Sequence, residues 1–294
     1  YGIDKFNSHC RESVMRYAHE WEYYVNRQAR WVDFTNDYKT MDTPYMESVL
    51  WAFKQLYDKG LVYQEMRVMP YSWACETPLS NFETRLDNSY RERSDKAATV
   101  AFKLKEKITL KDNKEVEAEI LAWTTTPWTL PSNLALAIGE NINYVVVHKT
   151  GRYFVLAESS IEHYRHELTN EAGEVEVVSE IAARELAEHA YEPLFPYFSG
   201  HQNAFRILIG EFVLEGDGTG VVHMAPGFGE DDNILCQKHN IELVCPVDNA
   251  GRFTDEVPDF AGVHVFDTND GIIKALKAAG RWIKTEMYVH NYPH

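Results

Sequence analysis

Two short stretches of this chain carry hydroxyl, imidazole and carboxylate groups at positions where a fold usually has apolar core residues or ordinary turn residues. The first, the threonine motif, is Trp123–Asn133 (WTTTPWTLPSN), and it follows the apolar run 118–122. The second, the histidine–acid motif, is Gly218–Asp232 (GTGVVHMAPGFGEDD). Together these residue types predict a small polar pocket that binds one substrate.

The threonine motif has two interpretations. Thr favours strands and bonds nearby backbone, so the motif could be a strand end followed by a proline-stiffened turn. Pro127 and Pro131, however, stiffen a segment that also carries Trp128 and several hydroxyls. Rigid loops that present hydroxyls and backbone N–H groups suit ligand binding. Because Thr cannot act as a general base, such a pocket would position water rather than deprotonate it.

The histidine–acid motif also has both structural and functional interpretations. Gly218-Thr219-Gly220 lacks the GxGxxG spacing and precedes a strand pattern, which favours a tight turn over 215–218 and not a dinucleotide site. His223 lies within the apolar stretch 221–224, where an ordinary buried histidine is an alternative to a functional one. The acids of 230–232 stand where a helix is expected to begin, and acids there interact favourably with the helix dipole.

The elements that must position these motifs begin with a helical segment at the start of the chain, here called the helical front. Apolar residues from Phe6 to Tyr24 recur at three- and four-residue steps and predict one helix face. A second helix is predicted with Thr43 as its cap, Pro44 in its first turn and Gly60 at its end. The apolar stripe of this helix consists of Met46, Val49, Leu50, Phe53 and Leu56.

From about Lys96 the pattern changes to short apolar runs rich in β-branched residues and separated by turn signals. The predicted strands are Ala97–Leu104, Glu119–Trp123, Tyr144–Val147, Tyr153–Leu156, Val175–Val178, Phe205–Ile209 and Val221–Met224. The predicted helices are Ser160–Leu168, Ala182–His189, Asp232–His239 and Gly271–Ala279. This mixture predicts an α+β fold around a barrel-like sheet, with interspersed helices, rather than an alternating parallel βαβ array.

Composition excludes several classes of protein. A chain of 294 residues that is 45% hydrophobic can bury a substantial core. The net charge of −16 argues against a protein that coats nucleic acid, although one nucleotide end could still dock in a local pocket. No apolar run approaches the roughly 20 residues that span a bilayer. The chain begins at Tyr1, so we expect it to be a piece of a longer protein.

Common catalytic and metal-binding signatures are missing. The sequence contains no GxSxG, HExxH, Walker A or CxxC motif. Its four cysteines are scattered, which indicates reduced thiols. His163 and His166 lie three residues apart in a predicted helix, but no third ligand has suitable spacing, so a solvent-facing pair is favoured.

The two motifs resemble the editing domain that is inserted into isoleucyl-tRNA synthetases, which belong to class I. The related valyl and leucyl enzymes usually carry a T-T-R-P-[ED]-T pattern, so Trp128 after Thr126-Pro127 favours the isoleucyl branch. The helical front matches as well, through the segments Tyr1–Asn7, Trp31–Phe34, Tyr38–Asp42 and Lys59–Tyr63.

The resemblance implies a helical segment and degenerate ribbon over 1–95, followed by an editing domain over 96–294. The HxGH and KMSKS activation signatures of the parent ATP-binding ligase are absent, so this piece should neither form aminoacyl-adenylate nor charge tRNA. Metal-binding relatives carry a CxxC where this chain has Ser72 and Cys75. We therefore predict no zinc, no other metal and no organic cofactor.

The activity that the resemblance implies is hydrolytic proofreading, the deacylation of valyl-tRNA specific for isoleucine, with valyl-adenylate as a second substrate. Asp232 should bind the α-ammonium of the substrate, and the threonines with Trp128 should form the wall and place the water. Thr129 and His223 should crowd a longer side chain. The resulting catalytic set is Thr125, Thr126 and Asp232, and the substrate-binding set is Thr124, Trp128, Thr129 and His223.

The implied partners are the tRNA acceptor end with its aminoacylated 3′ adenosine, the valine moiety and the remainder of the parent synthetase, without a membrane and in the cytoplasm. Two other functions stay open. The piece could be a non-catalytic module that binds the acceptor end or another domain. It could also be a free-standing thiol or threonine hydrolase with a covalent acyl intermediate.

Overall fold

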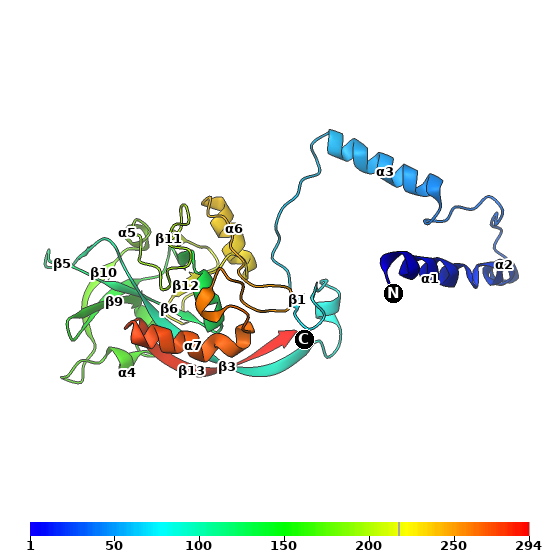
Figure 1. Ribbon diagram of the computed structural model, residues 1–294. Coiled ribbons are helices and arrows are strands. Elements are labelled where there is room, and N and C mark those ends of the chain that lie inside the picture. Colours follow the sequence, from blue (N-terminus) through cyan, green and yellow to red (C-terminus); the bar gives the residue numbers. More distant parts are fainter. Residues whose placement is uncertain (217, 294) are drawn as a thin grey trace. The chain divides into compact units, whose positions relative to one another are not determined.

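The computed structural model describes residues 1–216 and 218–293 (Figure 1). The chain separates into two compact units, Tyr1–Met66 and Arg67–His294. The predicted domain boundary at 95/96 lies inside the second unit, within strand β3 (Tyr90–Lys103). The boundary between the two compact units, at 66/67, therefore comes earlier in the chain than the predicted domain boundary. The domain boundary at 95/96 stays a prediction.

The first unit consists of helices α1 (Ile3–Met15), α2 (Ala18–Arg27) and α3 (Thr43–Asp58). The helix face predicted from Phe6 to Tyr24 is split, because Tyr17 has a non-helical backbone with φ −110° and ψ 8°. Asp42, not Thr43, occupies the cap position of α3, and Thr43 is its first helical residue. The predicted end is confirmed, since Gly60 adopts φ +69°, which glycine tolerates best.

The apolar faces of these helices lie uncovered. None of the three helices contains a buried residue. Trp21 is 66% exposed and Phe53, in the predicted stripe of α3, is 54% exposed. Contiguous apolar surface of this kind is typical of a face that packs against another part of a protein.

The second unit contains the sheet. Its strands are β3 (Tyr90–Lys103), β6 (Glu119–Thr124), β7 (Ala135–Ile138), β8 (Tyr144–Lys149), β9 (Arg152–Ala157), β10 (Glu176–Ile181), β11 (Arg206–Ile209), β12 (Val221–Met224) and β13 (Trp282–Pro293). Within the described residues these strands join in the order β10-β8-β9-β6-β12-β7-β11, and β3 pairs with both β6 and β13. The sheet mixes parallel and antiparallel pairs and curls on itself, with helices beside it (Figure 1). The predicted α+β class with a barrel-like sheet is confirmed.

Shorter elements complete this unit. The helices are α4 (Arg165–Leu168), α5 (Ala183–Leu186), α6 (Glu230–Lys238) and α7 (Val265–Ala278). The 3₁₀ turns are η1 (Glu83–Arg85), η2 (Pro127–Ser132), η3 (Glu158–Ser160) and η4 (Pro258–Phe260). Two small ribbons pair β1 (Tyr71–Ser72) with β2 (Thr77–Pro78) and β4 (Ile108–Thr109) with β5 (Glu115–Val116).

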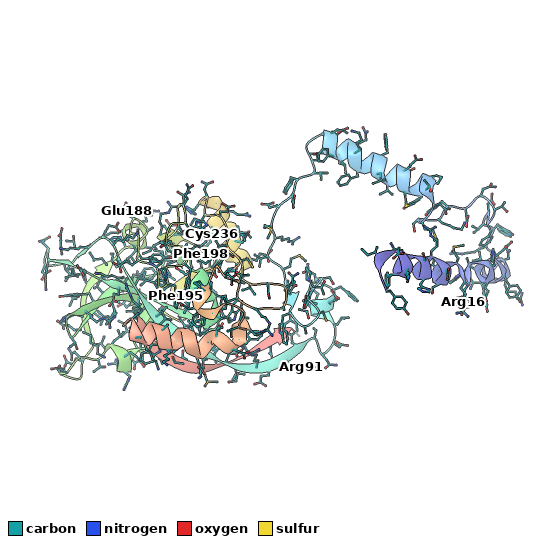
Figure 2. All side chains as sticks on the ribbon, viewed as in Figure 1. Arg16, Arg91, Glu188, Phe195, Phe198 and Cys236 are labelled. Atoms are coloured by element: carbon teal, nitrogen blue, oxygen red, sulfur yellow. The ribbon has the colours of Figure 1, made fainter. Side chains whose placement is uncertain are left out.

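All seven predicted strands are present, although β3 begins at Tyr90 and not at Ala97. Strands β7 and β13 and the short strands β1, β2, β4 and β5 were not predicted. The predicted helix 271–279 begins earlier, because the His264 side chain accepts the Phe266 N–H and caps α7. The predicted helix 160–168 is shorter, since only Arg165–Leu168 is α-helical and a 3₁₀ turn precedes it. One large apolar cluster joins buried residues of the strands with Cys236 of α6, and Phe195 and Phe198 pack against it (Figure 2). A smaller cluster lies around Tyr164.

The glycines before β12 serve a tight turn, as predicted. Gly216 and Gly218 have φ +94° and +55°, while Asp217 of the predicted turn lies outside the described residues. Thr219, fully buried, donates its hydroxyl to the Leu121 carbonyl on β6 at 2.7 Å. This hydrogen bond connects the start of β12 to β6.

Gly220→Ala is expected to lower the free energy of unfolding by about 2 kcal/mol. Gly220 has φ +71°, and an added Cβ would lie 2.4 Å from the Ala157 Cβ. Gly151→Ala is the matched control, because Gly151 also has positive φ (+79°) but nothing lies within 4 Å of an added Cβ. Urea unfolding of both variants measures the difference. Equal losses for the two variants would show that the contact with Ala157 is unimportant.

Candidate functional site

The two motifs meet at one edge of the sheet. Strands β6 and β12 run parallel, with Val222 opposite Trp123. The threonine motif continues from the end of β6 at Thr124, and the second half of the histidine–acid motif continues from the end of β12 at Met224. Because the carboxyl ends of parallel strands lie at the same edge, both segments leave the sheet on the same side.

The threonine hydroxyls form a connected row. Thr124 ends β6, Thr126 precedes η2 and Thr129 lies within η2, and both Thr124 and Thr129 are buried. The Thr126 Oγ1 lies 3.3 Å from the Oγ1 atoms of both Thr124 and Thr129. The Thr126 N–H donates to the Thr124 Oγ1 at 3.1 Å. Thr125 is half-buried in the bend between its neighbours.

A buried hydrogen-bond chain joins the two motifs. His223 Nε2 lies 2.9 Å from the Thr129 Oγ1, and its Nδ1 lies 2.9 Å from the Asn133 Nδ2. Asn133 also donates from Nδ2 to the Ala135 carbonyl at 2.9 Å. On the other side, the Tyr191 hydroxyl donates to the Asn133 Oδ1 at 2.7 Å. The histidine predicted from sequence is therefore in direct contact with the threonine motif.

These partners define the protonation of His223. An amide Nδ2 only donates, so the His223 Nδ1 accepts, and the proton of the neutral ring is on Nε2. That Nε2–H donates to the Thr129 Oγ1, whose own proton goes to the Thr126 carbonyl at 2.8 Å. Burial lowers the pKa of His223 to about 3, so the ring is neutral near pH 7.

Asp232 supplies a half-buried acid close to the end of β12. It lies in the first turn of α6, and its Oδ2 accepts the Ala225 N–H, directly after β12, at 2.8 Å. Burial raises the pKa of Asp232 to about 6, although the bond from Ala225 and the helix N-terminus both favour the ionised form. A Cβ on Gly229 would lie 2.8 Å from the Asp232 carboxyl group, so a larger residue there would displace this carboxyl group.

Trp128 forms the side of the site nearest α7. Its ring packs edge-on against Phe228 and Phe266, with centroids 4.8 and 6.5 Å away. Its backbone N–H donates to the Asn269 Oδ1 on α7 at 3.0 Å. The indole Nε1 is buried and has no hydrogen-bond partner among the described residues. An unpaired buried donor of this kind is suited to an acceptor on a ligand.

Of the predicted site residues, His223 bonds directly to the threonine motif, and Asp232 is tied to the residue that follows β12. Glu230 and Asp231 of the same acidic run are exposed at the start of α6. The backbone N–H groups of Thr126, Trp128 and Thr129 already have partners, so these three are not free to donate to a ligand.

Sequence reasoning missed four residues of this site: Asn133, Tyr191, Phe266 and Asn269. Asn133 was visible as the last residue of the threonine motif, and a polar residue after Pro131 was the only signal. The other three come from β11-proximal and α7 segments that carry no motif. Only the three-dimensional pairing of elements brings them to the site.

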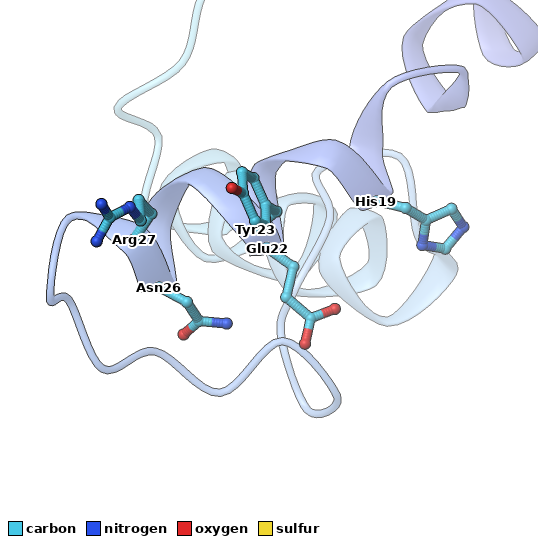
Figure 3. Close-up of a pocket in the computed structure, with 5 residues that line it drawn as sticks. All are labelled: His19, Glu22, Tyr23, Asn26 and Arg27. Atoms are coloured by element: carbon cyan, nitrogen blue, oxygen red, sulfur yellow. The ribbon is translucent and has the colours of Figure 1, made fainter.

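Other parts of the chain offer weaker sites. A shallow hollow of about 420 Å³ lies on α2 and contains no residue of either motif. Its lining residues, drawn in Figure 3, are His19, Glu22, Tyr23, Asn26 and Arg27. No group of three or more His, Cys, Asp or Glu suitable for a metal ion occurs within 1–216 and 218–293. At the ribbon of β1 and β2, the Cys75 N–H donates to the Ser72 hydroxyl at 3.3 Å. Among the described helices, none is long and apolar enough to cross a membrane.

The fold and the two motifs together define a class of protein. The sequence model of the family "tRNA synthetases class I (I, L, M and V)" matches residues 1–254, and the chain belongs to this family. Among its relatives, the isoleucine–tRNA ligase of Rickettsia canadensis is 62% identical over 294 residues and that of Rickettsia peacockii is 63% identical. Both alignments cover the whole chain but 27% of the relative, so the chain spans about a quarter of their length. The predicted resemblance to the isoleucyl branch is confirmed.

Two solved structures are distantly similar to this chain. The structure described as GlLeuRS-CP1 is 15% identical with a TM-score of 0.46, and covers 64% of this chain and 99% of its own. The Plasmodium knowlesi cytosolic leucyl-tRNA synthetase editing domain is 11% identical with a TM-score of 0.45, and covers 67% and 97%. These values indicate only a distant likeness.

Proposed function

We propose that the site at the ends of β6 and β12 hydrolyses the ester bond of valyl-tRNA specific for isoleucine. The observation that carries this proposal is the buried His223–Thr129 contact, with Asp232 held by the residue that follows β12. The site thus combines a wall of fixed shape with a half-buried acid. The isoleucine–tRNA ligases to which the chain is similar give the amino acid that such a site must protect.

A second site is needed because an isoleucine pocket cannot strongly exclude valine. One missing methylene changes binding by only about 1–3 kcal/mol, a range established on aminoacyl-tRNA synthetases themselves. A smaller hydrolytic pocket reverses the selection. Valine enters it, whereas the extra methylene of isoleucine would overlap packed atoms.

Asp232 would bind the α-ammonium group of the amino acid. A cation that leaves water requires a charged partner, and a buried carboxylate forms a charge-assisted hydrogen bond with it. The raised pKa of Asp232 indicates that the carboxylate lacks sufficient compensation in the free protein. An arriving ammonium group would supply that compensation, and this would favour binding of the charged amino acid.

Water, rather than a protein nucleophile, would attack the ester. His223 cannot accept the Thr129 proton, because its Nε2 carries a proton and its Nδ1 accepts from Asn133. Burial raises the pKa of the Cys236 thiol to about 12, which disfavours a thiolate there. In the proposed mechanism, Thr125 and Thr126 position the water, and Thr124 and Trp128 complete the wall.

Thr129 and His223 would exclude isoleucine. Both side chains are buried, and the bond between them fixes their rotamers. A fixed wall cannot move aside for an additional methylene, whereas a mobile one could. This rigidity supports their assignment to the sieve.

The proposed macromolecular partners are the aminoacylated 3′ end of tRNA and the remainder of the synthetase. The uncovered apolar faces of α1, α2 and α3 support the second partner, since such faces pack against other parts of a protein. A cytoplasmic location would follow from a role in the proofreading of charged tRNA. Hydrolysis of misactivated valyl-adenylate at the same site is a second part of the proposal.

The test is deacylation by the purified 294-residue chain, measured with valyl- and isoleucyl-charged tRNA specific for isoleucine. We expect valine release at least about tenfold faster than isoleucine release, from one methylene of selectivity. Equal rates would contradict the proposal. Binding of a nonhydrolysable valyl-adenosine analogue without release of valine would instead support a non-catalytic binding module.

A further inference from the structure

Tyr191 lies behind the site and carries no recognisable motif, yet it begins the hydrogen-bond chain that ends at Thr129. Its side chain is fully buried, and burial raises its pKa well above the usual value, so the phenol keeps its proton. That proton is donated to the Asn133 Oδ1 at 2.7 Å. Tyr191 reaches Asn133 from the segment before β11, where its backbone N–H donates to the Phe205 carbonyl.

The direction of each bond follows from the donors available. With Tyr191 donating to Oδ1, the Asn133 Nδ2 must face both the Ala135 carbonyl and the His223 Nδ1. An amide turned by 180° would place Oδ1 against the Ala135 carbonyl, which is repulsive. It would also accept a proton from His223 Nδ1 and so select the other tautomer. The phenol and the carbonyl therefore hold the amide in one orientation together.

We propose that Tyr191 is a positioning residue that acts through Asn133 to hold His223 in its Nε2–H tautomer. In this tautomer His223 donates to the Thr129 Oγ1, and Thr129 then donates to the Thr126 carbonyl. In the other tautomer the Nε2 would accept, and the Thr129 hydroxyl would have to turn away from Thr126. The orientation of a wall residue thus depends on a phenol two side chains away. The consequence for valine selection rests on the proposed function, whereas the tautomer does not.

The primary test is ¹⁵N NMR of the histidine-labelled 294-residue chain, in which protonated and unprotonated ring nitrogens are distinct. The His223 signals are assigned by their loss in His223→Gln. We expect a protonated Nε2 and an unprotonated Nδ1 in the parent chain. Tyr191→Phe should give a mixture of both tautomers, because the Asn133 Oδ1 loses its donor. Tyr164→Phe is the matched control, since Tyr164 is equally buried and loses one hydroxyl bond, to Thr99.

A second variant, at Asn133, tests the same hydrogen-bond chain. Asn133→Asp has only acceptors, so it should move the proton of His223 to Nδ1 even where Tyr191→Phe folds poorly. A parent chain with a protonated Nδ1 would overturn the proposal. A single Nε2–H tautomer in both variants would overturn it as well.

Deacylation assays separate this proposal from the proposed function. If both hold, Tyr191→Phe lowers the kcat/KM for valyl-tRNA about tenfold, the size of a lost buried hydrogen bond, and Tyr164→Phe leaves it unchanged. If the tautomers change as expected but neither the parent chain nor the variants release valine, the proposed role of Tyr191 is correct and the proposed hydrolysis is wrong. If the parent chain releases valine rapidly but the His223 tautomer does not change in the variants, the proposed hydrolysis is correct and the proposed role of Tyr191 is wrong.

Discussion

Asp232→Asn is expected to lower kcat/KM for deacylation of valyl-tRNA at least about a hundredfold near pH 7.5. The amide keeps the shape and can still accept the Ala225 N–H, but it has no charge for the α-ammonium group. Leaving a buried ion without its partner costs about 3–5 kcal/mol, which corresponds to this factor or more. Asp231→Asn is the control, because Asp231 is adjacent and exposed. If Asp232→Asn deacylates as fast as the parent chain, the proposed amine contact is wrong.

The pH dependence provides a second readout of the same residue. The pKa of Asp232 in the free protein is raised to about 6, so its ionised fraction falls below that pH. Since kcat/KM reports groups of the free enzyme, we expect it to fall about tenfold per pH unit below pH 6 and to level off above about pH 7. Asp232→Asn should lose this bend after subtraction of spontaneous hydrolysis. An unchanged profile in the variant would assign the bend to another group.

The same carboxylate should lower the stability of the parent chain. Its pKa is higher in the folded protein, about 6, than the ordinary value of 3.8. The neutral form therefore stabilises the fold below about pH 4, and this contribution is lost as the pH rises through 6. The difference between these two pKa values corresponds to about 3 kcal/mol. Urea unfolding should show Asp232→Asn more stable than the parent at pH 8, by up to this amount, and similar to it at pH 4.

Several parts of the fold could be predicted because they depend on local sequence. The runs that became β6, β8, β9 and β12 are short, apolar and bounded by turn signals, and such runs are decided by residues close in the chain. The end of α3 at Gly60 is local in the same way. The strand β7 was missed because Ala135–Ile138 follows a proline-rich segment directly, without a turn signal to separate them.

The site could be predicted only in part, because its geometry depends on pairing between distant segments. His223 was ambiguous from sequence, since an apolar neighbourhood is typical of any buried histidine. Its proposed role depends on two partners, Thr129 and Asn133, that the parallel pairing of β6 and β12 brings within 2.9 Å. Asn269 and Phe266 are decided by how α7 packs on η2, and no local pattern encodes that contact.

Thr129→Ala is expected to raise the deacylation of isoleucyl-tRNA by about 10- to 100-fold while valyl-tRNA remains a substrate. The substitution removes the methyl group and the hydroxyl group that contacts His223, and it leaves space for one methylene, which is worth about 1–3 kcal/mol. Thr268→Ala is the matched control, because Thr268 is also buried and also donates its hydroxyl three residues back, to the Val265 carbonyl. The measurement is the ratio of the two deacylation rates.

Thr129→Val separates the shape of the wall from its hydrogen bonds. Valine keeps the branched volume of threonine but gives the His223 Nε2–H no acceptor, so we expect lower stability with isoleucine still excluded. If the alanine variant admits isoleucine and the valine variant does not, the sieve is a matter of volume at residue 129. If both variants admit isoleucine, the bond to His223 holds the wall in place. Unchanged discrimination in both would remove Thr129 from the sieve.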